Sequence, residues 1–151
     1  MAQDVSGFGF VLYVQASNTF PSGFPVSAFA DDSDPFDFPS IAVNDVAMGL
    51  NGDLVSWSKA IPLKTTFGVI PGSDEDINLA ILLEANRVGQ GKTSARDIVT
   101  VTAVYPDGST ASLINGKITN GPPSGSVGSS GRIKSKVYGF AFENRTVTNA
   151  T

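Results

Sequence analysis

Hydrophobic and polar residues alternate along much of the chain with the two-residue period of a β-strand. Residues 8–16 combine aromatic and β-branched side chains, and residues 97–105 place Val and Ala opposite Thr. Both patterns predict strands. Residues 41–50 and 54–59 flank Asn51-Gly52, a dipeptide that accepts positive φ at both central turn positions, so they predict a hairpin. We expect further strands at residues 63–70, 109–119 and 132–143.

One segment, residues 73–88, has helical periodicity. Ser73 is suited to cap its N-terminus, and Asp76 follows three residues later, where a capping box places an acid. Asp74 and Glu75 add negative charge to the first turn, which the helix dipole favours. The sequence therefore predicts one helix among strands.

Three other segments lack either period. Residues 17–40 read as a long Phe/Pro-rich loop, residues 120–131 as a flexible Gly/Ser loop, and residues 144–151 as a loose polar tail. The long loop must bury its rings on its own domain or on a neighbouring subunit. Five phenylalanine side chains are therefore candidates for contacts between subunits, or between stacked rings of subunits: Phe20, Phe24, Phe29, Phe36 and Phe38.

The predicted elements together describe one domain over residues 1–151 with a mainly β fold. We expect an antiparallel β-sandwich or barrel with one inserted α-helix. The N-terminus has no positively charged region, and no apolar run approaches the roughly 20 residues that span a bilayer. We therefore expect a protein made in the cytoplasm.

The composition narrows the chemistry. The chain has no Cys and no His, which excludes disulfides, zinc sites of the Cys/His type, and Cys or Ser-His nucleophiles. Its net charge is −4 with only ten Lys and Arg residues and no basic run, which argues against tight nucleic-acid binding. We expect no enzymatic activity, no cofactor, no metal site and no small-molecule substrate.

Two short motifs resemble ligand sites but do not fit their chemistry. Gly91-Lys92-Thr93-Ser94 is like the end of a phosphate-binding loop, yet Asn86 stands where that motif needs glycine, and the segment leaves a helix instead of entering one. The acidic run 31–34 with Asp37 lacks the spacing and the glycine of an EF-hand. We interpret it as a solvated acidic loop.

The order of these features resembles phage tail tube proteins of the contractile type, which are related to type VI secretion tubes. The resemblance rests on the hairpin around Asn51-Gly52, on the acid-capped helix with its AILLEAN segment, and on the closing strands. Those strands run through Pro106-Asp107-Gly108 and Asn115-Gly116 to a final aromatic strand. The similarity covers residues 8–143.

The resemblance implies that the protein assembles with itself. Hexameric rings would form when open sheet edges pair between subunits, and the rings would stack into a tube. DNA would pass through an acidic lumen without specific binding. Candidate contacts include the hairpin turn Asn51, Gly52 and Asp53, besides the five phenylalanines. The protein would reside in the virion tail, after synthesis in the bacterial host cytoplasm.

The same resemblance implies partners: the tail sheath, the baseplate and the tail terminator. The acidic side of the helix is the candidate sheath contact, through Asp74, Glu75, Asp76 and Glu84. Capping and solvation of the helix explain these acids equally well. Two other functions fit the sequence: another virion β protein, such as a tail terminator or decoration protein, and a ligand-binding β-sandwich module.

Overall fold

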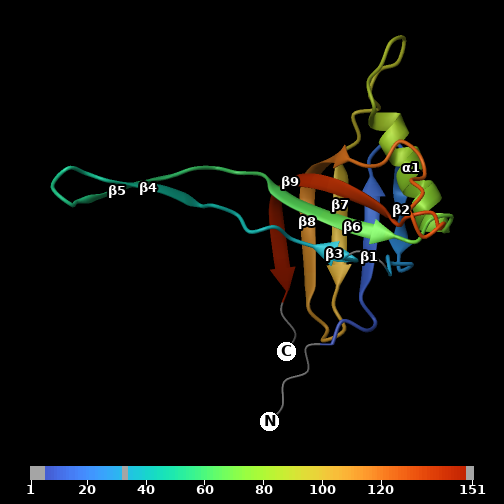
Figure 1. Cartoon of the computed structure of the whole chain (residues 1–151), viewed down its shortest axis with the longest axis horizontal. Coiled ribbons are helices and arrows are strands. Elements are labelled where there is room, and N and C mark those ends of the chain that lie inside the picture. Colours follow the sequence, from blue (N-terminus) through green and yellow to red (C-terminus); the bar gives the residue numbers. More distant parts are fainter. Residues whose placement is uncertain (1–5, 32–33, 149–151) are drawn as a thin grey trace.

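The computed structural model describes residues 6–31 and 34–148 (Figure 1). No helix in these ranges has the length and apolar character to cross a membrane. The elements in chain order are β1 (Val11–Ala16), β2 (Phe20–Val26), β3 (Phe36–Asp37), β4 (Asn44–Met48), β5 (Leu54–Ser58), β6 (Leu63–Val69), α1 (Asp74–Asn86), β7 (Val99–Val104), β8 (Thr110–Asn120) and β9 (Lys136–Thr148).

Seven of the described strands form one antiparallel sheet in the order β2-β1-β7-β8-β9-β6-β3. Strands β4 and β5 pair only with each other. The prediction of a mainly β, antiparallel fold with one helix is confirmed. Because β2 and β3 end the strand order without pairing to each other, the sheet stays open.

The core lies on one face of this sheet. Alternation in β7 buries Val99, Val101 and Ala103, as the sequence pattern predicted. Four large buried rings fill the middle: Phe67, Tyr138, Phe140 and Phe142. Leu79 and Leu82 of α1 are fully buried in the same cluster, and the helix contacts β2 and β8.

The helix begins as predicted. The Ser73 side chain accepts a hydrogen bond from the Asp76 backbone N–H at 3.3 Å. The Asp76 carboxylate accepts from the Gly72 N–H at 3.0 Å and from the Tyr138 hydroxyl at 3.1 Å, and it pairs with Lys136 at 3.3 Å. Burial and the adjacent carboxylate raise the pKa of Tyr138 far above its ordinary value. This cluster fixes the N-terminus of α1 on β9.

A second polar cluster, around the fully buried Asp97, fixes the other end of α1. Its carboxylate accepts from the Thr19 hydroxyl at 2.5 Å, from the Thr19 N–H at 2.9 Å, and from Asn86 Nδ2 at 2.8 Å. The Asn18 N–H donates to it at 2.7 Å. Burial alone would raise the pKa of Asp97, but these hydrogen bonds outweigh it and the pKa is lowered.

Two segments differ from the sequence prediction. Residues 17–40 are not a loop throughout, because Phe20–Val26 form β2 and pair with β1. The polar tail is not loose over its described part, because β9 continues through Thr148 in register with β8. The Gly/Ser segment separates two strands as predicted, but β8 still includes Asn120 and the last strand begins at Lys136, not at residue 132. Val127 of this segment forms a β-bridge with Ile133.

Candidate assembly surface

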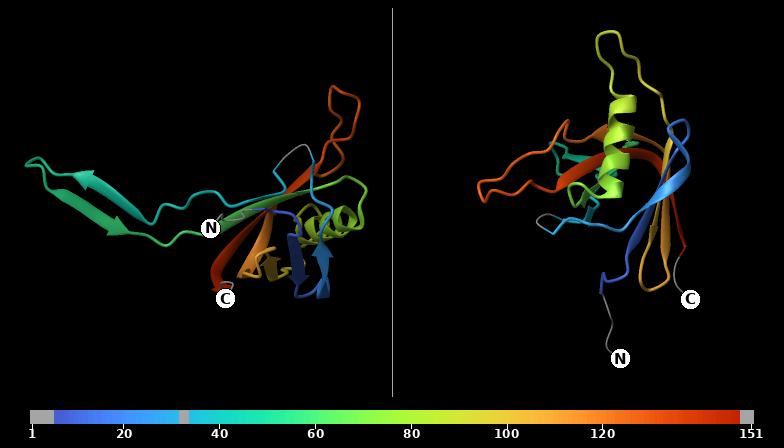
Figure 2. Two further views of the ribbon diagram at one scale, coloured as in Figure 1. Left: turned by 90° about the horizontal axis from the view of Figure 1, so that it is seen from below. Right: turned by 90° about the vertical axis from the view of Figure 1, so that its right-hand side faces the viewer.

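The most prominent surface feature is an arm formed by residues 39–62. Its outer part is the β4–β5 ribbon, and Figure 1 shows it extending sideways from the sheet. A perpendicular view in Figure 2 shows the same projection, so the ribbon does not fold back over the body. The ribbon forms no strand pair with the main sheet. The arm therefore contributes nothing to the core of its own chain.

The predicted turn lies at the tip of the arm. The Gly49 N–H donates to the Asp53 carbonyl at 2.7 Å, and the Gly52 N–H donates to the Gly49 carbonyl at 3.0 Å. Gly52 has a φ of 88°, a left-handed value that favours glycine. The candidates Asn51, Gly52 and Asp53 therefore lie in the turn at the tip of the arm, and all three are exposed.

The ribbon carries exposed apolar side chains on both of its faces. On one face, Val46, Met48 and Leu54 are 60%, 66% and 64% exposed. On the other, Val55 and Trp57 are 53% and 50% exposed. A soluble two-stranded ribbon would place apolar residues against a core on one face and polar residues on the other. Apolar residues on both faces indicate a surface that a partner covers.

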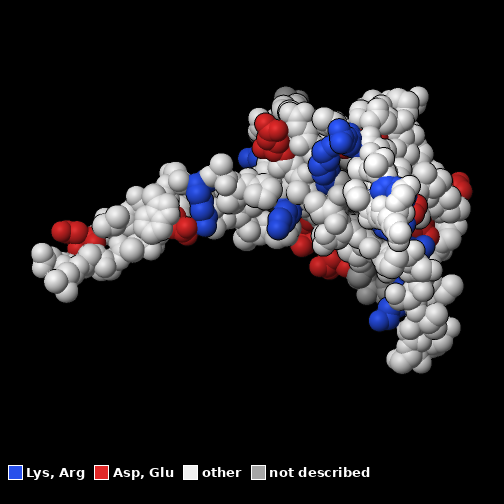
Figure 3. All heavy atoms as spheres, turned by 90° about the horizontal axis from the view of Figure 1, so that it is seen from above, with Lys and Arg blue, Asp and Glu red and all other residues white. Residues whose placement is uncertain are grey.

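Charge on the arm is sparse. Its charged residues are Asp45, Asp53 and Lys59, and the Asp45 carboxylate pairs with Lys59 at 2.9 Å across the ribbon. Figure 3 shows the arm as a mainly uncharged surface beside a more charged body. Little charge needs to be desolvated when this surface is covered, which favours an apolar interface.

Four of the five candidate phenylalanines pack in or against the core of their own chain. Phe24 is buried in the core, and Phe20, Phe29 and Phe36 pack against that core. Phe36 lies 5.1 Å from the ring of Phe10, between ring centroids. Phe38 is the most exposed of the five, at 43%. Burial in a neighbouring subunit is therefore not needed to explain the first four rings.

The proposed sheath-contact residues fall into two groups. Asp74 and Glu84 are exposed and Glu75 is half-buried. Glu84 is paired with Arg87 at 2.8 Å, and the hydrogen bond from that guanidinium is the main cause of its lowered pKa. Asp76 is only 3% exposed, accepts a hydrogen bond from Tyr138 and pairs with Lys136, so its side chain is not available for contact with a sheath.

The sheet edge formed by β2 bears on the expected pairing between subunits. At this edge, Tyr13 of β1 pairs with Pro25 of β2, which has no N–H. The hydrogen bonds between β1 and β2 therefore come from the neighbouring residue pairs, and the backbone nitrogen of Pro25 faces away from β1. Pro21 also lacks a donor, and Gln15 Nε2 donates to its carbonyl at 2.7 Å. Prolines at an edge prevent further pairing, so the β2 edge is a poor acceptor for a neighbouring strand.

Comparison with known proteins supports a tail origin. Residues 3–146 match the family described as Tail fiber protein gp32. No curated protein sequence matches the chain significantly.

Three solved structures share the fold at low sequence identity. A chain of the PVC sheath/tube terminator in the extended state, from an extracellular contractile injection system, has a TM-score of 0.59 at 12% identity, covering 99% of each chain. A chain of the PVC sheath-tube complex has a TM-score of 0.59 at 14% identity, covering 98% of this chain and 93% of that one. A chain of the anti-feeding prophage baseplate, 6-fold symmetrised, has a TM-score of 0.58 at 9% identity, covering 100% and 99%.

At these identities the structural likeness shows the fold alone, and the fold is one found in phage-tail-like particles. The family match covers nearly the whole sequence. The chain belongs to the Tail fiber protein gp32 family.

Proposed function

We propose that this chain is a self-assembling structural protein of a virion tail and that it forms the tail tube as stacked, hexameric rings. The observation that carries the proposal is the arm, which presents apolar side chains on both ribbon faces and whose ribbon forms no strand pair with the main sheet. Family membership and the shared fold support a role in the tail. The 6-fold symmetry of one similar assembly supports the hexamer.

The proposed partners follow from the same assembly. The arm contacts other copies of the chain, and the sheath, baseplate and terminator proteins contact the finished tube. The exposed acids of α1, Asp74 and Glu84, remain the proposed sheath contact. DNA passes through the lumen without specific binding, and the protein resides in the virion tail after synthesis in the host cytoplasm.

The sheet face opposite the core is the proposed lumen wall. Alternation places Gln15, Thr100, Thr102 and Ser112 there, together with Lys117. These residues carry three hydroxyl groups and one amide, not the acids that the tube resemblance implied. The neutral groups give phosphates little to bind, and a single lysine per subunit is not a basic cluster, so the face is compatible with passing DNA.

We further propose that the protein has no catalytic activity. Without Cys or His, general acid–base chemistry and nucleophilic attack would depend on carboxylates, Lys or Tyr. Two buried groups have structural explanations for their pKa shifts: burial and the neighbouring Asp76 carboxylate raise the pKa of Tyr138, and hydrogen bonds from Thr19, Asn86 and Asn18 outweigh burial and lower the pKa of Asp97.

A tail terminator is the second candidate, favoured by the likeness to a chain of a sheath/tube terminator assembly. Negative-stain electron microscopy of the purified protein over a range of concentrations separates the two. A tube subunit gives stacked rings or hollow tubes whose length grows with concentration. A terminator gives single closed rings at every concentration, and monomers throughout would refute both.

A further inference from the structure

The C-terminal part of β9 has one paired edge and one open edge. Strand β8 runs alongside β9 as far as Thr148, whereas β6 begins at Leu63, opposite Phe142. Residues 143–148 therefore have β8 on one side and, among the described strands, no neighbour on the other. All six residues are exposed. An open edge of this kind presents unpaired backbone groups to another strand.

The backbone N–H groups of residues 145–147 point alternately to the open edge and to β8. The Arg145 N–H donates to the side chain of Asn144 at 2.8 Å, so it points away from β8. Successive residues of a strand direct their N–H groups to opposite sides. The Val147 N–H therefore points to the open edge, and the Thr146 N–H points to β8.

An apolar groove lies beside this edge. It has a volume of about 340 Å³, and its apolar lining comes from Phe38, Ile41, Leu63 and Leu113. Lys64 and Arg145 supply positive charge to the same groove. Leu113 pairs with Arg145 across the β8–β9 ladder, so the groove and the open edge adjoin. A strand added here would gain backbone hydrogen bonds and a place for its apolar side chains.

Among the described strands, the β4–β5 ribbon is the one suited to pair with this edge. Strand β2 is blunted by Pro21 and Pro25, and β3 has only two residues. Strands β4 and β5 each have five residues, contain no proline, and keep their outer edges unpaired. The ribbon also carries one more negative than positive charge, through Asp45, Asp53 and Lys59, which complements Lys64 and Arg145.

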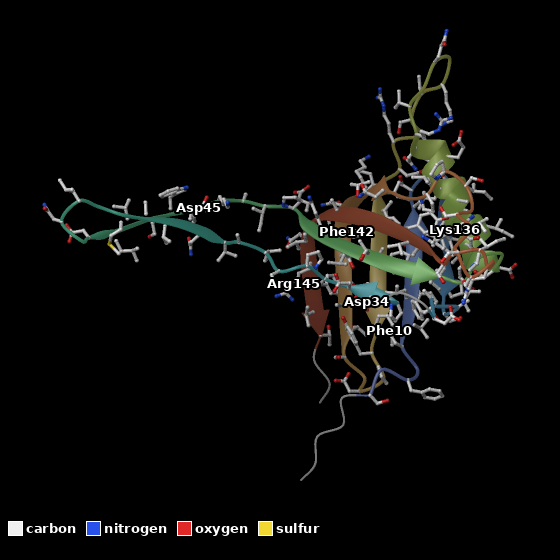
Figure 4. The ribbon with its side chains drawn as sticks, viewed as in Figure 1. Phe10, Asp34, Asp45, Lys136, Phe142 and Arg145 are labelled. Carbon is white, nitrogen blue, oxygen red and sulfur yellow. The ribbon has the colours of Figure 1, made fainter. Side chains whose placement is uncertain are left out.

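The ribbon that reaches this edge must come from another copy of the chain. Ile41 lines the groove at the start of the arm, and the arm then leads away from the body. Figure 4 shows Arg145 on the side of the sheet from which the arm departs, with Asp45 well out along the arm. The ribbon of the same chain thus lies away from its own open edge.

We propose that the open edge of β9, residues 143–148, accepts the β4–β5 ribbon of a second copy as an added strand, with one apolar ribbon face over the groove. The inference rests on the proposed self-assembly and names the acceptor for the arm.

The first test is a matched pair of proline variants on β9. Val147→Pro removes the N–H that faces the open edge, so the monomer should keep its melting temperature while assembly falls at least tenfold. Val147→Thr keeps that N–H and should assemble like the wild type. Thr146→Pro removes the N–H that β8 uses and should lower the melting temperature. Normal assembly of Val147→Pro would overturn the proposal.

The second test is disulfide trapping, which the absence of native cysteine makes unambiguous. A tagged chain with Thr146→Cys is assembled with an untagged chain that carries one ribbon cysteine: Val46→Cys, Ala47→Cys, Val55→Cys or Ser56→Cys. At least one mixture should give a tagged–untagged disulfide dimer under mild oxidation. In the control, the tagged chain carries Ser129→Cys, in the exposed segment between β8 and β9, in place of Thr146→Cys. This mixture should give no tagged–untagged disulfide dimer.

The outcomes separate this inference from the proposed function. If the wild type never forms rings or tubes, the proposed function fails. If it assembles but no ribbon cysteine is trapped by β9, or if the disulfide forms equally with the control, self-assembly stands and β9 is not the acceptor.

Discussion

Replacing the apolar residues on one ribbon face tests whether the arm drives assembly. The variant Val46→Ser/Met48→Ser/Leu54→Ser changes only one face of the β4–β5 ribbon. The three side chains are 60%, 66% and 64% exposed, so most of their surface is available to a partner. The variant should fold normally and lose the ability to associate.

The size of the effect follows from these exposed fractions. Full burial of a Val, Leu or Met side chain contributes about 1.5–3 kcal/mol. The available two-thirds or so of each gives about 1–2 kcal/mol, and the three together give about 4 kcal/mol. That corresponds to roughly a thousandfold loss in association constant. Exposed substitutions change the stability of the monomer by only about 0.5 kcal/mol.

Two measurements on the same preparation check this prediction. Light scattering against concentration gives the threshold for assembly, and thermal unfolding gives the monomer stability. A control variant removes exposed apolar residues outside the arm: Val88→Ser/Val127→Ser/Ile133→Ser, from positions that are 70%, 71% and 51% exposed. If the ribbon variant and this control assembled at the same threshold, the reasoning from ribbon exposure would be refuted.

Three further predictions concern the fold that supports the arm. Asp97→Asn should cost about 3 kcal/mol and lower the melting temperature, because the partly buried donors of Thr19 and Asn86 lose a charged acceptor. Since the folded pKa of Asp97 is lowered, this contribution is present above a pH of about 4 and is lost as the pH falls through the folded pKa, so wild type and variant should converge in acid. Phe36→Ser should lower the urea midpoint by removing a ring packed on the core, whereas Phe38→Ser, at a 43% exposed ring, should change it little; equal effects would contradict the assignment. Gly116→Ala should destabilise strongly in thermal unfolding, because its Cβ would lie 2.1 Å from Phe142 Cδ1, whereas Gly125→Ala, with its nearest neighbour at 3.5 Å, should be tolerated.

The strands and the helix were predictable where local physics decides them. Alternation in residues 97–105 reflects one buried and one polar face, and the Ser73 cap reflects the unsatisfied donors of a helix start. The hairpin at Asn51-Gly52 was predictable for the same reason, because its turn needs a positive φ.

The differences arose where the environment of a strand departs from the usual one. β2 contains Pro21 and Pro25, which normally argue against a strand, yet an edge position tolerates a missing donor. The end of β9 is polar because it lies at an open edge without a core beneath it. The sequence pattern predicted neither feature because both depend on which strands lie alongside.

The candidate assembly surface was only partly visible in the sequence. The tip residues Asn51, Gly52 and Asp53 were identified, but periodicity does not report that the whole ribbon projects from the body. The phenylalanines of residues 17–40 drew attention as an interface because of their number, and most serve the core of their own chain. The pairing of β6 with β9, which leaves residues 143–148 open, joins segments far apart in the sequence.

The separation of the arm from the core has a consequence for the kinetics of polymerisation. A two-stranded ribbon without a supporting layer is marginally stable in water, so the first contact between subunits must also pay the entropy of ordering it. That cost makes early oligomers unfavourable, while a growing end offers ribbons already held in place. We expect polymer growth to show a lag phase that preformed ends abolish, which would restrict elongation to an existing tail.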